Sequence, residues 1–176
     1  MTEMVTALKE ALDYTRLYRE QIFVLKLGGE VLAAREALEG FAVQVALLES
    51  LSIRVVVVHG GGPQASVLSR RLGLEPEIVA GRRVTSPEVL EVAKMVYAGS
   101  LNVDVLAALR AHRVPAVGLS GIDAGLVTVR RRPPVEVVDD QGSARMVDFG
   151  EVGDVEGVDT TLLDVLLPRG FVPVVA

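Results

Sequence analysis

The chain has 176 residues, half of them hydrophobic, no cysteine and a formal net charge of −5. This length suits one domain with a substantial core, and the lack of cysteine excludes disulfide and thiolate chemistry. The acidic balance argues against a partner held through nucleic-acid phosphates. Charged side chains interrupt the first twenty residues, from Lys9 to Glu20, so they predict neither a signal peptide nor a membrane span. We therefore expect a cytoplasmic protein with no nucleic-acid or membrane partner.

Residues 3–20 predict an amphipathic helix. At about 100° per residue, one broad face collects apolar side chains and the opposite face is charged. The apolar face holds Met4, Val5, Ala7, Leu8, Ala11, Leu12, Tyr14 and Tyr18, the charged face holds Lys9, Asp13, Arg16 and Glu20, and Leu17 is the outlier. Such a helix packs on its own domain or pairs with a second subunit, and we treat residues 1–20 as an N-terminal helix distinct from residues 21–176.

From residue 21 onward, short apolar runs alternate with helical stretches. This alternation is typical of a mostly parallel sheet covered on both faces. Strands are predicted at 22–29, 53–60, 115–121 and 170–176, and helices at 35–49, 63–72, 86–113 with a break near Gly99 and Ser100, and 159–167. The expected fold class is therefore α/β, with a mostly parallel open sheet and helices on both faces.

The segment from 126 to 152 has a different texture. Apolar and polar residues alternate in it, and it contains Pro133-Pro134 and Asp140-Gln141-Gly142. These features predict small antiparallel hairpins on the edge of the main sheet, that is, a β-hairpin excursion near 126–150.

Two glycine-rich segments follow the first two predicted strands: Lys26-Leu27-Gly28-Gly29 and His59-Gly60-Gly61-Gly62-Pro63. In a parallel sheet, ligands collect beyond the carboxyl ends of the strands. Glycines allow backbone N–H groups to approach a ligand closely, and Pro63 suits the first turn of a helix whose N-terminus attracts anions. Gly-Gly segments also serve plain turns, so both roles stay open. Neither segment fits the Walker A or G-x-G-x-x-G pattern.

Three basic residues near these loops are candidates for binding. Lys26 lies in an otherwise apolar strand, where a charge is costly unless it reaches a polar loop or a partner. Arg82 and Arg83 precede a predicted helix that Thr85 or Ser86 can cap. An arginine fork suits a carboxylate, although adjacent arginines also commonly form a solvated face.

Five segments together resemble the N-acetylglutamate kinases of the amino-acid kinase family. They are KLGG at 26–29, HGGGPQ at 59–64, GRRVT at 81–85, YAGSLNVDVLAAL at 97–109 and AVGLSGIDAGL at 116–126. They occur in that family's order and spacing, and the resemblance runs from about residue 22 to the end. It implies a phosphotransferase that uses ATP with Mg to phosphorylate the γ-carboxylate of N-acetyl-L-glutamate in arginine biosynthesis.

The resemblance also implies how the phosphoryl group is held. Lys26 would stabilise charge on the transferring group, and the backbone N–H groups of Gly28, Gly29 and Gly61 would hold phosphate oxygens. A carboxylate nucleophile is already ionised at pH 7, so the reaction needs no general base. We therefore expect His59 to be structural and assign no metal ligand.

The resemblance places the amino-acid substrate at the second glycine loop. Gly61 and Gly62 would contact it, Arg83 would bind its α-carboxylate, and Asn102 matches a family asparagine near the substrate pocket. Asp123 is expected to serve a turn.

In the family, the strand that resembles residues 170–176 is followed by an Asn-x-Asn-Ala-Asp segment and an ATP-binding lobe. The resemblance thus implies that residues 21–176 form the amino-terminal lobe, which binds the amino acid and dimerises, with the ATP-binding lobe missing. We expect the 176-residue chain to be inactive alone. Residues 7–21 resemble the helix that precedes the first strand in arginine-inhibited hexameric members. A homodimer, a hexamer formed through this helix and inhibition by arginine are the corresponding expectations.

Two alternatives stay open. The chain would suit a regulatory or oligomerising kinase-like domain that binds arginine. It would also suit a kinase for aminoadipate or glutamate linked to a carrier protein, for which a strongly basic docking surface is expected; VRRRPP at 129–134 hints at such a surface.

Overall fold

A computed structural model describes residues 2–75, 77–138 and 144–176. Its central sheet has four parallel strands in the order β1-β2-β10-β5. They are β1 (Ile22–Leu27), β2 (Arg54–His59), β5 (Ala116–Leu119) and β10 (Val172–Val175). β1 and β2 pair along their whole length, up to Leu27 opposite His59. The predicted open, parallel sheet is confirmed.

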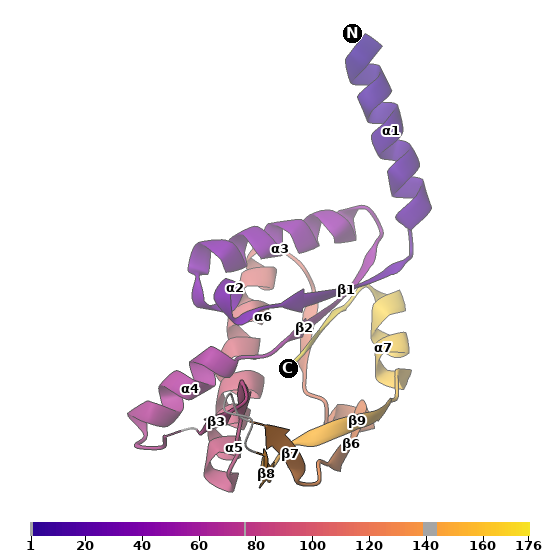
Figure 1. The fold of residues 1–176 in the computed structure, drawn as a ribbon. Helices are drawn as coiled ribbons and strands as arrows, with labels where there is room; N and C mark the ends of the chain where they lie inside the picture. The colour runs from indigo at the N-terminus through magenta and orange to yellow at the C-terminus, as the bar shows by residue number, and fades with distance from the viewer. Residues whose placement is uncertain (1, 76, 139–143) are drawn as a thin grey trace.

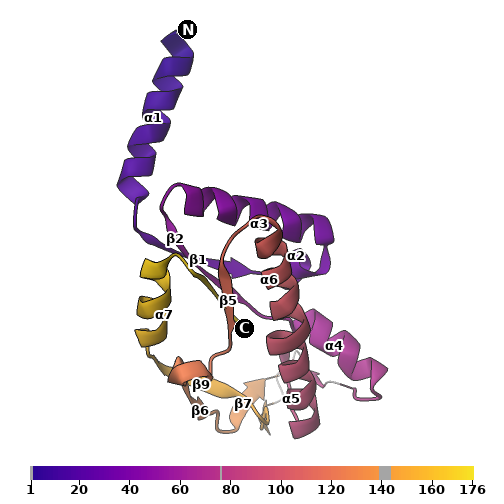
Figure 2. The same ribbon diagram turned by 180° about the vertical axis from the view of Figure 1, so that it is seen from behind.

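Helices lie on both sides of this sheet. α3 (Arg35–Ser50) and α6 (Asn102–Ala111) cover one face, and α7 (Thr161–Leu166) lies on the opposite side (Figures 1 and 2). Val45 of α3, Val57 of β2 and Leu109 of α6 are completely buried between the sheet and the first pair of helices. Each such side chain contributes about 1.5–3 kcal/mol on burial, so the apolar runs seen in the sequence are the core.

The predicted break in the 86–113 helix is wrong. α5 (Pro87–Lys94) continues through a π-helical segment, Met95–Leu101, directly into α6. The wider π turn absorbs Gly99 and Ser100 without ending the helix, and the Ser100 hydroxyl donates to the Val96 carbonyl at 3.3 Å. Of the two predicted caps, Ser86 is the one used, since its Oγ accepts from the Val89 N–H at 3.3 Å.

This continuous helix, Pro87–Ala111, is long and apolar enough to cross a membrane by composition. Its apolar side chains, however, belong to the protein interior: Val92, Val105 and Leu109 are all buried against other elements. The helix therefore gives no positive support for a membrane span, and a cytoplasmic location stays a prediction.

The excursion after β5 forms two antiparallel ribbons. They are β6 (Val127–Arg131) with β9 (Gly153–Val158), and β7 (Val135–Val138) with β8 (Ala144–Val147). Their predicted place on the edge of the main sheet is wrong, because in the described ranges neither ribbon pairs with the four central strands. The β7–β8 ribbon packs instead in a separate small core of Val79, Val147 and Phe149. The Asp140-Gln141-Gly142 turn lies outside the described residues.

Two short strands and one short helix were not predicted as such. β3 (Ile78–Val79) pairs with β4 (Arg82–Arg83), and α2 (Gly29–Ala33) begins at the last residue of the first glycine loop. α4 (Gly62–Arg71) begins inside the second glycine loop, as predicted to within one residue. Both glycine loops therefore lead into helices at the carboxyl edge of the sheet.

The predicted N-terminal helix is present as α1 (Thr2–Tyr18), which projects away from the sheet in both views (Figures 1 and 2). Its described apolar side chains are exposed, among them Val5, Leu12 and Leu17. The Tyr18 ring meets the Phe23 ring edge to face, with centroids 5.6 Å apart. The side chains of Met4, Ala7, Leu8, Ala11 and Tyr14 lie outside the described set.

Candidate functional site

The two glycine loops lie side by side at the carboxyl ends of β1 and β2. Lys26 is in register with Val58, and Leu27 with His59. The Gln64 side chain joins the loops, because its Nε2 donates to the Gly29 carbonyl at 2.9 Å. Residues that are more than thirty positions apart in the sequence thus face one small volume.

Gly61 brings the second loop against the π-helical segment. A Cβ at this position would lie 2.3 Å from Cδ1 of Leu101 and 2.9 Å from Cδ1 of Tyr97. The φ of Gly61 is −171°, which other residues also adopt, so packing rather than backbone conformation requires glycine. No side chain caps α4 at Gly61, and the first N–H groups of a helix lack partners within it. These amides are therefore available to an anion.

Arg83 is held over the start of α4. Its Nη2 donates to the Gly62 carbonyl and to the Ser66 hydroxyl, and Ser66 Oγ donates to the same carbonyl at 3.0 Å. Arg83 Nε is buried and has no hydrogen-bond partner among the described residues. The guanidinium is thus fixed beside the glycine loop with donor capacity to spare.

A cavity of about 430 Å³ opens beside this arginine. Gly62, Arg83 and Tyr97 line it together with Arg82 and Arg132. The Arg132 charge is balanced because its Nε donates to Asp154 at 2.9 Å. A cavity of this size suits a small molecule. Apart from the paired Arg132, its lining holds the guanidinium groups of Arg82 and Arg83 and one carboxylate, Glu151, so the excess positive charge favours an anion.

Lys26 differs from Arg83 in its surroundings. It is exposed on the same face of β1 as Ile22 and Val24, whereas Phe23 and Leu25 point to the core side. Within the described ranges it forms no ion pair or side-chain hydrogen bond. Its position next to the loops agrees with the sequence prediction, while its role stays a prediction.

Asn102 and His59 are buried together behind the loop, each with 4 % of its surface exposed. Asn102 Nδ2 lies 3.2 Å from His59 Nε2 and 3.0 Å from the Val174 carbonyl oxygen. His59 Nδ1 lies 3.2 Å from the Gly60 carbonyl oxygen. Burial lowers the pKa of His59 below its usual 6.5, and the hydrogen bond to Gly60 opposes this effect. His59 is therefore neutral near pH 7.

The predicted turn role of Asp123 is confirmed. Its carboxylate accepts from the Ser120 N–H at 2.6 Å and from the Ser120 hydroxyl at 2.9 Å. The other histidine, His112, contacts the Glu39 carboxylate at 3.1 Å, away from the glycine loops.

Sequence reasoning missed two polar residues of the site, Gln64 and Ser66. Gln64 belongs to the HGGGPQ segment, but the sequence predicted no separate role for it. Ser66 had no predicted role because its partner Arg83 is seventeen positions away. Ser66 lies one helical turn after Gly62, so a helix predicted from 63 could have placed it on the loop-facing side.

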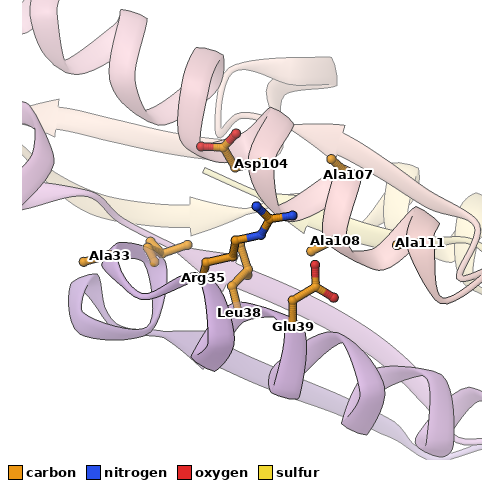
Figure 3. A pocket seen from close by; sticks show the side chains of 9 residues that line it. Ala33, Arg35, Leu38, Glu39, Asp104, Ala107, Ala108 and Ala111 are labelled. Atoms are coloured by element: carbon orange, nitrogen blue, oxygen red, sulfur yellow. The ribbon is translucent and has the colours of Figure 1, made fainter.

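A second cavity, of about 520 Å³, lies between α3 and α6 (Figure 3). In Figure 3 the Arg35 side chain extends between Asp104 and Glu39, and alanines of α6 form the opposite wall. None of the predicted site residues lines this cavity, so we do not assign the reaction to it.

A metal site needs several ligating side chains close together. Within residues 2–75, 77–138 and 144–176, no three His, Asp or Glu side chains come together as a metal site. The groups that the sequence predicts to face phosphate are backbone amides and one lysine. We therefore derive no step through Mg from these residues.

Comparison with known proteins shows which family this chain belongs to. A family model described as the amino acid kinase family matches residues 21–176. The chain belongs to the amino acid kinase family. Within that family, it is similar to the acetylglutamate kinase of Myxococcus xanthus, with 50% identity over 172 residues that cover 97% of this chain and 56% of the relative. The acetylglutamate kinase of Symbiobacterium thermophilum is 41% identical over 174 residues, which cover 99% of this chain and 58% of the relative.

Two solved structures share the fold of this chain. The N-acetylglutamate synthase of Neisseria gonorrhoeae, complexed with coenzyme A and N-acetyl-glutamate, matches with a TM-score of 0.73 at 28% identity, over 97% of this chain and 37% of that chain. The synthase complexed with coenzyme A and L-arginine matches with a TM-score of 0.69 at 25% identity, over 97% and 38%. The chain spans 56% to 58% of the length of the two kinases above.

Proposed function

We propose that this chain is the substrate-binding lobe of an acetylglutamate kinase, which transfers the γ-phosphoryl group of ATP to the γ-carboxylate of N-acetyl-L-glutamate. The observation that most supports this proposal is that the Arg83 guanidinium is held beside Gly61 and Gly62, where α4 begins. It supplies a carboxylate-binding fork next to free backbone amides, and the chain is 50% identical to an enzyme of that name. The fold and the positively charged lining of the cavity support the same function.

In the proposed complex, Arg83 binds the α-carboxylate, and Gly61 and Gly62 present their N–H groups to the substrate. The γ-carboxylate oxygen attacks the γ-phosphorus of ATP, and the bond from that phosphorus to the oxygen bridging to the β-phosphorus breaks. The products are an acyl phosphate and ADP. No proton moves, because the nucleophile is already ionised, and neutral His59 is not needed as a base.

Charge on the transferring group is stabilised by Lys26 and by the amides of Gly28, Gly29 and Gly61. Such donors act by being fixed before the reaction begins. The chain spans little more than half the length of its kinase relatives. The remaining contacts to ATP with Mg are proposed to come from the ATP-binding lobe.

Calorimetric titration with N-acetyl-L-glutamate tests this proposal. The wild-type chain should bind, and Arg83→Ala should weaken binding by about tenfold to a hundredfold, since a hydrogen bond to a charged group contributes about 1.5–3 kcal/mol. Arg131→Ala is the matched control: it removes the same charge from an exposed arginine that pairs with Asp148 at 3.2 Å. Absence of binding by the wild type, or equal affinities of Arg83→Ala and wild type, contradicts the proposal.

Regulation by arginine is a second candidate. A solved synthase that shares this fold contains L-arginine, and α1 carries exposed apolar side chains suited to assembly, either in a homodimer or in a hexamer. Arginine titrated in the same calorimeter separates the two: binding of arginine without N-acetyl-L-glutamate favours the regulatory function.

The alternative with a carrier-linked substrate loses the support of the VRRRPP segment. Arg130, Arg131 and Arg132 are each paired with an acidic residue: Glu156, Asp148 and Asp154, respectively. These arginines therefore do not form an unbalanced basic surface, and the free amino acid derivative is the substrate class we propose.

A further inference from the structure

We propose that Asn102 and His59 are a positioning pair, which holds the Gly60–Gly62 loop in its substrate-binding shape. Neither side chain touches the substrate in this proposal; both act through the backbone of the loop. The inference replaces the expected substrate contact of Asn102 and rests on the proposed function for its binding measurement only.

The neighbours of the Asn102 amide determine its orientation. Its Nδ2 lies 3.0 Å from the Val174 carbonyl oxygen and 3.5 Å from the Leu119 carbonyl oxygen. Both carbonyls can only accept, so the nitrogen and not the oxygen must face the ends of β10 and β5. The oxygen lies against Gly118, where a Cβ would come within 2.1 Å of it. The absence of a side chain at Gly118 is what leaves room for this orientation.

The tautomer of His59 follows from that orientation. Its Nε2 faces the donor Nδ2 of Asn102 at 3.2 Å, so Nε2 must accept. In a neutral imidazole the proton is then on Nδ1. Nδ1 lies 3.2 Å from the Gly60 carbonyl oxygen, to which it donates. Only the neutral ring protonated at Nδ1 satisfies both neighbours.

This chain of hydrogen bonds aims one amide of the loop. Gly60 is exposed and has no side chain of its own to hold it. Because the peptide unit is planar and trans, fixing the Gly60 carbonyl also fixes the N–H of Gly61, which points the opposite way. That N–H is one of the groups proposed to hold substrate and phosphate oxygens, so the ends of β5 and β10 set its direction through Asn102 and His59.

Two variants of His59 separate positioning from simple support of the fold. In His59→Gln, Oε1 takes the place of Nε2 and still accepts from Asn102, but the donor to Gly60 is lost. In His59→Asn, Nδ2 takes the place of Nδ1 and still donates to Gly60, but the acceptor for Asn102 is lost and a gap is left. Each variant therefore keeps one of the two hydrogen bonds of His59 and loses the other.

We expect stability and binding to rank in opposite order. His59→Gln should melt closer to wild type yet bind N-acetyl-L-glutamate about fivefold more weakly, which corresponds to one lost hydrogen bond. His59→Asn should melt lower yet bind within about twofold of wild type at a temperature where it is folded. Affinity that simply follows stability in both variants overturns the proposal.

Nuclear magnetic resonance tests the positioning role of Asn102 and His59 without any bound substrate. In the wild-type chain the ¹⁵N shifts of His59 should show a proton on Nδ1 and none on Nε2 at pH 7, and a proton on Nε2 overturns the proposal. The order parameter of the Gly61 amide should fall from about 0.85 toward 0.6 or below in His59→Gln and stay high in His59→Asn. If the wild type does not bind N-acetyl-L-glutamate, the proposed function fails, while these two measurements still decide the positioning pair.

Discussion

Replacing Gly61 by alanine tests how closely the substrate loop packs on the π-helical segment. The added Cβ would lie 2.3 Å from Cδ1 of Leu101 and 2.9 Å from Cδ1 of Tyr97. The φ of −171° lies outside the left-handed region that favours glycine, so we attribute the expected cost to this clash. Overpacking of this kind costs about 1–3 kcal/mol. In a chain of this size each kcal/mol lowers the melting temperature by about 2–4 °C, so we expect a fall of roughly 2–12 °C.

The matched control is Gly60→Ala, because nothing lies within 4 Å of a Cβ at that position. It should change the free energy of unfolding by less than about 0.5 kcal/mol. Urea unfolding followed by circular dichroism measures both variants. In a Leu101→Ala background the cost of Gly61→Ala should shrink, since the closest clashing atom is gone. A Gly61→Ala chain as stable as Gly60→Ala would refute the close packing.

Two further predictions concern Arg83 and His59. Ser66→Ala removes one of the two acceptors of Arg83 Nη2 and should weaken N-acetyl-L-glutamate binding about threefold to tenfold in calorimetry. The control Ser69→Ala removes a buried hydroxyl without a described partner and should leave this binding unchanged. Equal effects of the two variants contradict the role of Ser66. The lowered pKa of His59 means that the unfolded chain binds a proton more readily, so the free energy of unfolding should fall as the pH drops below about 6.5. His59→Gln should lack this part of the loss, and identical losses contradict it.

The fold was largely predictable because its signals are local. Four consecutive valines before His59 indicate a buried parallel strand, and β2 is that strand. The ribbons after β5 were misplaced because alternation of apolar residues does not tell which partner a strand takes. The β7–β8 ribbon packs in the small core around Val147 and Phe149, which is built from long-range contacts.

The candidate site was predictable in its glycines and basic residues but not in its support. Lys26 and Arg83 stand out because charge is unusual at those places in the pattern. Gln64 and Ser66 do not, since polar residues in the first turn of a helix are ordinary. Their importance comes from contacts with Gly29 and Arg83, which only the folded chain brings within reach.

The two ends of the proposed pocket differ in how completely this chain builds them. Arg83 is half-buried and fixed by Gly62 and Ser66, so its attraction for a carboxylate is little weakened by water. Lys26 is exposed beside Val24, which is 65% exposed, and a solvated charge attracts a phosphoryl group only weakly. Strong stabilisation at Lys26 requires this face of β1 to be covered and water excluded. Binding of the amino acid without turnover is therefore what the electrostatics of the two ends lead us to expect from this chain.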